Sequence, residues 1–210
     1  MRRSLAMFLV SAAGLAAVTV QAAGSAAAAP SGRAAPAAGT ITATYPVTGS
    51  TFISKVNGTV SLGPGTLVST LDLSTSALTS TLTLPPATGT FKILGFIPVT
   101  ATTEFIQNGP APGTLKNGVV TTTASVTLKL DSLSIGGIPI LIGDECQTSS
   151  PASITVTSQP GFNLLNGGNL AGTYTIPPFS HCELATFLIN LTIPGPNNTI
   201  TLTLGKAKLS

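Results

Sequence analysis

The segment HCELATFLINLTIPGPNNTITLTL, residues 181–204, decides how the C-terminal part of the chain folds. Apolar side chains recur at positions i, i+3, i+4 and i+7 over residues 184–191, which predicts a short helix with one apolar face. A buried strand is the alternative for the same eight residues. The proline- and asparagine-rich residues 194–198 then predict a turn. Residues 199–204 alternate threonine with isoleucine or leucine, which predicts a final strand.

Cys182 lies in this segment, and Cys146 is the other cysteine of the chain. Two cysteines in an exported chain, with no odd thiol left over, predict a disulfide bond. Closing a loop of about 36 residues stabilises a fold by roughly 3.5–4 kcal/mol in the chain-entropy model. A redox or metal pair is the alternative, but the sequence has no Cys-x-x-Cys spacing and a single histidine.

Upstream of this segment the sequence predicts antiparallel strands. Residues 78–84 alternate leucine with threonine, as a strand with one buried and one wet face does. Residues 85–86 are both proline, which ends that strand. Asn117-Gly118 predicts a two-residue hairpin before a long strand over 119–130. About ten such strand candidates predict one mainly β domain, a sandwich or a barrel, with the short helix before its last strand.

The N-terminus predicts export. Two arginines precede an uncharged apolar run over residues 5–20, and small residues follow, so residues 1–28 are interpreted as a signal peptide. The run is shorter than a membrane-spanning helix needs, and no transmembrane segment is expected after the signal is removed. The Ala/Pro-rich residues 29–39 predict a disordered leader. Residues 40–210 form the predicted β domain, which is expected outside the cell or at the cell wall.

Charge excludes one class of partner. Only 7% of residues are charged, whereas 43% are hydrophobic, which favours a packed core over disorder. The chain has nine Lys and Arg against six Asp and Glu. Without Arg2 and Arg3 of the signal the balance is seven against six, or +1. The remaining cations are scattered, so we expect no nucleic-acid binding.

Residues that could carry chemistry are few. His181 is the sole histidine, and the sequence has no Gly-x-Ser-x-Gly elbow, so His181 is interpreted as structural and no catalytic residue is assigned. Asp144, Glu145 and Glu183 flank the two cysteines and form a weak candidate Ca²⁺ site. Carboxylates in a surface loop are more often simply solvated. We therefore expect neither a metal nor another cofactor.

The most apolar stretch of the predicted domain is FKILGFIPV, residues 91–99. Its default interpretation is a core strand interrupted by glycine and proline. The functional alternative is a rim or lid over an apolar cavity, lined by Phe91, Ile93, Phe96 and Ile97.

Four segments together resemble uncharacterised secreted proteins of actinomycetes, which are Gram-positive, GC-rich bacteria. The segments are TIPPFSHC (175–182), IPGPNNTITLTL (193–204), LPPATGTF (84–91) and LGFIPVTATTE (94–104). Their motifs are structural in kind, so the resemblance carries over no catalytic residue. It implies an exported protein and leaves its activity open.

Three classes of function remain at this point. The first is a non-enzymatic extracellular or cell-envelope-associated β protein. The second is a β-barrel or sandwich that binds an apolar ligand or lipid. A hydrolase is the third and least favoured class, because polar chemistry is sparse.

Overall fold

A computed structural model describes residues 39–210 with the exception of residue 94. The predicted signal peptide (1–28) lies outside the described residues. The predicted leader (29–39) also does, apart from its last residue. The first strand begins at Thr40, where the β domain was predicted to begin.

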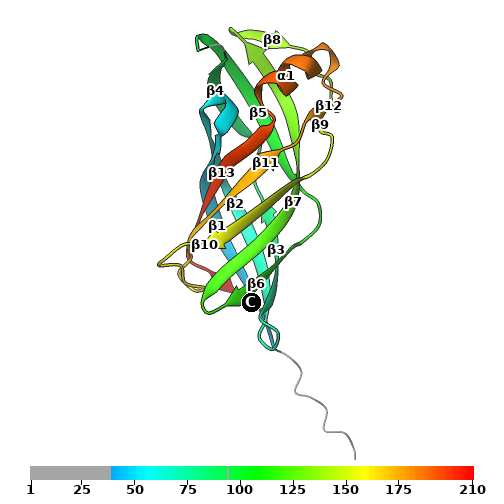
Figure 1. Ribbon diagram of the computed structural model, residues 1–210. Coiled ribbons are helices and arrows are strands. Elements are labelled where there is room, and N and C mark those ends of the chain that lie inside the picture. The colour runs from blue at the N-terminus through cyan, green and yellow to red at the C-terminus, as the bar shows by residue number, and fades with distance from the viewer. Residues whose placement is uncertain (1–38, 94) are drawn as a thin grey trace, which may run out of the picture. The chain divides into compact units, whose positions relative to one another are not determined.

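The described chain is mainly antiparallel β-sheet, as predicted (Figure 1). The strands are β1 (Thr40–Ile53), β2 (Gly58–Asp72), β3 (Ala77–Thr83), β4 (Ala87–Ile93), β5 (Ile97–Gln107), β6 (Ala111–Lys116), β7 (Val119–Ile135), β8 (Ile138–Ile140), β9 (Gln147–Thr148), β10 (Ala152–Ser158), β11 (Gly168–Ile176), β12 (Phe179–Ser180), β13 (Gly195–Leu204) and β14 (Lys208–Leu209). The helices are the 3-10 turns η1 (Ser54–Val56) and η2 (Glu183–Ala185), and α1 (Thr186–Thr192).

Eight of these strands close into a barrel, which decides between the two predicted architectures. The ring runs β1, β2, β3, β6, β7, β10, β11, β13 and back to β1. The closing pair joins β10 to β7, with Ala152 opposite Val126 and Thr157 opposite Thr121. Closure pairs the edges that an open sheet would leave exposed.

Local sequence sets the hairpins of the ring. Asn117 and Gly118 both have positive φ, 51° and 78°, as the predicted two-residue turn between β6 and β7 requires. Between β2 and β3, the Asp72 carboxylate accepts hydrogen bonds from the backbone N–H and hydroxyl of Ser74 and from the backbone N–H of Thr75. These bonds hold the turn between β2 and β3.

The strand β7 is longer than its ring neighbours and organises the end of the barrel that carries α1 and β8 (Figure 1). Its first part pairs with β6, and its second part pairs with β5, from Val126 opposite Gln107 to Ile135 opposite Val99. The hairpin β4–β5 therefore extends the wall beyond the end of β6. The stretch 91–99 lies at the tip of this hairpin, and its strands are interrupted around Gly95 as predicted, whereas Pro98 lies inside β5 opposite Lys92.

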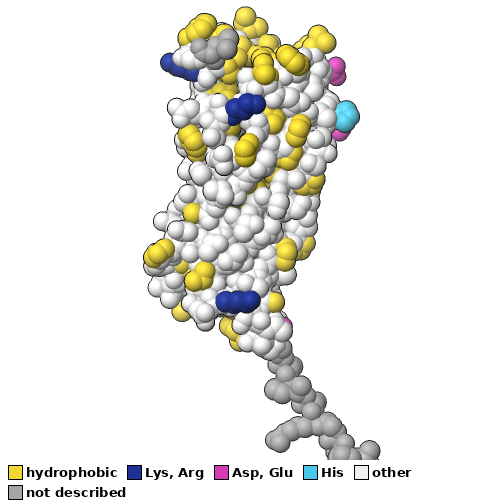
Figure 2. Space-filling model, viewed as in Figure 1, with side chains coloured by type: hydrophobic (Ala, Val, Ile, Leu, Met, Phe, Trp, Pro, Cys, Tyr) yellow, Lys and Arg dark blue, Asp and Glu magenta, His cyan; other side chains and the backbone are white. Residues whose placement is uncertain are grey.

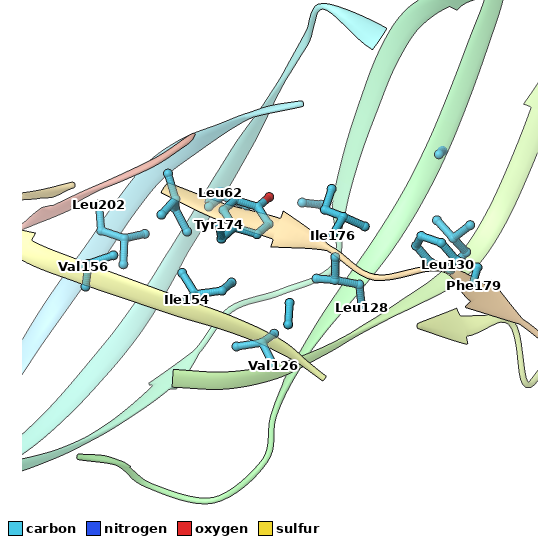
Figure 3. Packing of buried hydrophobic residues seen from close by; sticks show 14 of the residues in the cluster. Leu62, Val126, Leu128, Leu130, Ile154, Val156, Tyr174, Ile176, Phe179 and Leu202 are labelled. Atoms are coloured by element: carbon cyan, nitrogen blue, oxygen red, sulfur yellow. The ribbon is translucent and has the colours of Figure 1, made fainter. Parts of the chain in front are cut away.

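Alternate residues of the strands point into the barrel and form its core. Val126, Leu128 and Leu130 alternate along β7 and are all buried. They pack inside the barrel with Ile154 of β10 and Ile176 of β11 (Figure 3). The described residues leave no buried side-chain nitrogen or oxygen without a hydrogen-bond partner. The interior at this level is an apolar core whose buried polar side-chain atoms are all paired.

Threonine covers much of the outer wall in place of charge. Hydroxyls of neighbouring strands pair across the ladders, as in Thr123–Thr155 at 2.8 Å and Thr88–Thr102 at 2.9 Å. Cross-strand Thr pairs each add a fraction of a kcal/mol to a sheet. They give the barrel a polar surface with few ionised groups.

The predicted helix is present as η2 followed by α1, and the alternative of a buried strand is excluded. Its orientation differs from what the apolar spacing suggests. Ala185 and Ile189 are buried against the barrel, whereas Leu184 and Phe187 are 99% and 77% exposed. Asn190 fixes the helix by accepting a hydrogen bond from the Phe179 N–H and donating one to the Phe179 carbonyl.

A candidate apolar ligand site

The barrel is not filled along its whole length. A cavity of about 200 Å³ lies inside the ring at the end opposite α1, where the β10–β11 loop and the C-terminus are found (Figure 1). Its wall comes from β1, β2, β3, β7, β11, β13, β14 and the β10–β11 loop. The side chains that line it include Ala43, Tyr45, Leu67, Leu78, Phe162 and Leu170.

A row of small residues makes this space. Ala43 on β1 lies opposite Ser69 on β2, Ser69 lies opposite Ser80 on β3, and Ser80 lies opposite Ala111 on β6. All four side chains line this cavity or a smaller space of about 70 Å³ that adjoins it on the side toward α1. Elsewhere in the ring most inward positions carry a larger side chain, such as Tyr45, Leu67 and Leu170. Four small side chains on adjacent strands therefore leave the interior unfilled.

The few polar groups of the wall are already paired within the protein. The Ser69 and Ser80 hydroxyls lie 2.9 Å apart, and the Thr122 hydroxyl donates to the Pro112 carbonyl at 3.0 Å. The Tyr45 hydroxyl donates to the Leu164 carbonyl at 2.7 Å, and burial raises the pKa of this phenol. No charged side chain of the described chain lines the cavity. The space therefore offers shape and apolar contact but little hydrogen bonding.

The cavity reaches the surface through an apolar mouth. Leu73, Leu165 and Leu209 line it and are 56%, 54% and 55% exposed, and Ile41 is 38% exposed. They belong to the end of β2, the β10–β11 loop, β14 and the start of β1. Large apolar side chains that stand half in water around an opening mark a binding rim more often than a random surface.

Toward α1 the interior narrows. A space of about 70 Å³ adjoins the cavity, shares Leu67, Ser80 and Leu170 with it, and continues to Phe105. Beyond Phe105 a pocket of about 50 Å³ remains around Phe91 and Tyr174. Tyr174 spans the interior beside this pocket, and its hydroxyl lies 2.7 Å from that of Thr51. Burial raises the pKa of Tyr174. The barrel is therefore roomy at one end and packed at the other.

The sequence pointed to a different part of the barrel for a ligand. Phe91 lines the 50 Å³ pocket, and with Ile93 it lines a gap of about 10 Å³ under α1. Phe96 is 72% exposed at the hairpin tip, and Ile97 is partly buried. None of these four residues lines the 200 Å³ cavity. Tyr45 and the small residues of β1–β3 were missed, because they carry no apolar run.

The disulfide prediction is confirmed. Cys146 and Cys182 are bonded, and both are fully buried. The bond ties the β8–β9 loop to the turn between β12 and η2. It lies at the packed end of the barrel and fixes the base on which α1 rests.

The weak metal candidate is not supported by the geometry. Asp144, Glu145 and Glu183 are exposed, and no group of three such side chains within the described residues is arranged to hold a metal ion. The disulfide links the two loops through their cysteine side chains, but the neighbouring carboxylates remain exposed to water. His181 is also exposed, and its Nδ1 lies 3.1 Å from the Ser180 hydroxyl beside it.

No helix within residues 39–210, residue 94 aside, is long and apolar enough to cross a membrane. Comparisons with protein-family models, curated proteins and solved structures find no match for this chain.

Proposed function

We propose that this protein is an exported, non-enzymatic β-barrel that binds one small, neutral, apolar molecule in the cavity beside Tyr45. One observation carries the proposal: an apolar cavity of about 200 Å³ opens through an apolar rim inside a closed eight-stranded ring. Barrels of eight strands are either filled by their own side chains or hold one small ligand. Here a row of small residues favours the second case.

The wall chemistry selects the class of ligand. A carboxylate or ammonium in the cavity would lose its hydration and meet no ionised or unpaired partner, which costs several kcal/mol. A hydrocarbon chain or an apolar ring system has no such hydration to lose and therefore pays no comparable free-energy cost. Apolar cavities of about 150 Å³ bind benzene or xenon, so this slightly larger space accommodates a short alkyl chain or one to two rings.

The expected affinity follows from the volume. An unfilled apolar cavity costs about 24 cal/mol per Å³, so filling 200 Å³ is worth at most about 5 kcal/mol. That corresponds to a dissociation constant on the order of 0.1–1 mM for a ligand confined to the cavity. A longer chain that continues into the adjoining 70 Å³ or covers the rim leucines binds more tightly.

Export is supported by the predicted signal peptide and by the buried disulfide, because such bonds persist in oxidising compartments. The resemblance to secreted actinomycete proteins agrees with this. An extracellular or envelope location also gives the barrel access to apolar molecules outside the cytoplasm. No catalytic residue is assigned, since His181 is exposed and distant from the cavity wall.

The direct test is a fluorescence titration with N-phenyl-1-naphthylamine, a neutral probe whose emission rises in apolar surroundings. Its two-ring naphthyl group suits the cavity, and its phenyl ring can extend to the apolar rim. We expect saturable binding that 1-decanol displaces and sodium decanoate displaces much less. Ser80→Leu, which puts a large side chain into the small-residue row, should weaken binding of the probe. Val68→Thr, on the outer wall, is the control and should not. Equal binding to Ser80→Leu, or no saturable binding at all, would overturn the proposal.

A further inference from the structure

The packed end of the barrel carries an exposed apolar surface, which we call the apolar cap. Six large hydrophobic side chains on three loop tips form it: Phe96, Ile138, Leu141, Leu184, Phe187 and Leu191. They are exposed for between 59% and 99% of their area. Figure 2 shows apolar side chains gathered at the end where Figure 1 places α1 and β8. The proposed ligand site lies at the opposite end, so it does not account for the cap.

Hydrogen bonds and packing hold these tips together. The β4–β5 tip lies beside the β7–β8 turn, where the Gly136 N–H donates to the Pro98 carbonyl at 2.8 Å. The inner side of α1, with Leu188 and Ile189, packs on strands of both hairpins. The loop after β8 runs beside η2, where an ideal Cβ built on Gly143 would lie 3.3 Å from the Glu183 carboxylate. The cap is therefore one surface built on a fixed base.

The sequence of α1 places its largest apolar side chains on the wrong side for a surface helix. Such a helix normally turns polar residues to water and apolar residues to the core. Here the inward side uses Ala185, Leu188 and Ile189, while Leu184, Phe187 and Leu191 point outward. Neighbouring threonines show that polar residues fit this chain well. An outward apolar stripe of this kind indicates a surface that is covered in the working protein.

The size of the cap suits a protein interface. At roughly 150 Å² for each fully exposed large side chain, the six residues expose on the order of 700 Å². This exceeds the largest apolar patch of a typical monomer, about 300–600 Å². It approaches the ~800 Å² that each partner contributes to a standard stable interface.

Charge around the cap identifies the occupant. Lys55 lies beside the C-terminal end of α1, where its Nζ donates to the Pro194 carbonyl at 3.3 Å, and Lys92 lies near the β4–β5 tip. Glu183 begins η2 at the other end of the helix, and Asp144 and Glu145 precede the cysteine that is bonded beside it. Figure 2 shows cationic and acidic side chains on opposite sides of this end.

A surface with opposite charges on its two sides is complementary to itself after a twofold rotation. Two caps placed face to face, with their α1 helices antiparallel, bring the lysine side of one copy to the acidic side of the other. We propose that the cap is the interface of a head-to-head homodimer. Its apolar centre and charged rim match the anatomy of such interfaces. This proposal does not depend on the ligand site.

A lipid surface fits the same observations less well. Anionic membranes attract proteins through clusters of four to eight cations. The cap has two lysines, and three carboxylates oppose them. Mixed charge gives no attraction to such a membrane, whereas it is what a second copy requires.

The test is sedimentation velocity of the purified, disulfide-bonded protein over a wide concentration range. We expect a monomer–dimer equilibrium, and the double variant Leu184→Ser/Phe187→Ser should raise the dissociation constant by at least about tenfold. These two apolar side chains are the most exposed of η2 and α1, so the fold should persist, as circular dichroism would verify. Leu165→Ser/Leu209→Ser removes two half-exposed leucines at the other end and should leave the dimer unchanged.

Charge exchange tests the twofold arrangement itself. Lys55→Glu and Glu183→Lys should each weaken the dimer, and the double exchange should restore most of the loss. A monomer at all concentrations would overturn the proposal. So would a dimer that resists Leu184→Ser/Phe187→Ser. Binding of a monomeric protein to phosphatidylcholine vesicles that depends on Phe187 would assign the cap to lipid instead.

Discussion

Replacing Ala43 with leucine tests whether the interior of the barrel has room. Ala43 is 8% exposed, lines the 200 Å³ cavity and sits in the row of small residues. Leucine adds three carbon atoms, each worth about 0.8 kcal/mol when it is buried without strain. Because the cavity offers space for them, we expect Ala43→Leu to raise the free energy of unfolding by about 2 kcal/mol. The same substitution in a filled core costs 1–3 kcal/mol.

Urea denaturation measures this difference well. With a slope of about 1–3 kcal/mol per molar urea, a gain of about 2 kcal/mol moves the midpoint upward by roughly 1 M. Ala87→Leu is the matched control. Ala87 is 6% exposed in the same core but does not line the cavity, so the added atoms there should destabilise.

The sign of the change in unfolding free energy for Ala43→Leu shows whether the cavity is open in solution. If Ala43→Leu destabilises the protein as much as Ala87→Leu does, the space beside Tyr45 is closed in solution and the ligand site is refuted. If it stabilises the protein, the same variant should bind N-phenyl-1-naphthylamine more weakly, since the added side chain competes with the probe for one volume.

Three further predictions concern the frame of the barrel. Gly172→Ala should cost about 3 kcal/mol or more in urea denaturation, because an ideal Cβ there would lie 1.9 Å from the Thr155 carbonyl oxygen. Replacing both Cys146 and Cys182 with serine should lower the unfolding free energy by roughly 4 kcal/mol in the same assay, and an unchanged value would deny the bond a stabilising role. Stability should fall above about pH 10, because the raised pKa of Tyr45 and of Tyr174 keeps both protons in the folded state while the unfolded chain loses them. Tyr174→Phe should remove part of that alkaline decline in a pH series of thermal melts, and Tyr45 should account for a further part.

Several parts of the fold could be predicted because their causes are local. The hairpin at Asn117-Gly118 needs positive φ at two consecutive residues, and few other pairs supply it. The buried face of β7 follows from a strict period of two. The disulfide follows from a count of two cysteines. Each of these signals lies within a few residues or in the composition, so no knowledge of the ring was needed.

The cavity and the cap could not be predicted in this way. Ala43 and Ser80 are unremarkable in their own strands, and they form a row only once the register of four strands is known. The exposed side of α1 follows from where Asn190 and the disulfide fix the helix, which its own periodicity does not specify. A helical period shows that a face is apolar, but it does not show whether the barrel or a partner covers that face.

The two proposed surfaces lie at opposite ends of one rigid ring, and this separation has a thermodynamic consequence. Head-to-head association covers the cap of each copy and leaves both cavity mouths open at the far ends. Between them stands the narrower part of the barrel, where Leu128, Ile154 and Tyr174 leave spaces of only about 70 and 50 Å³ and the buried polar atoms are paired. Coupling between two sites requires an element with two arrangements that both ligands bias, and a closed ring with paired polar groups provides none. Ligand affinity and dimer affinity should therefore be independent, so that loss of one surface leaves the other intact.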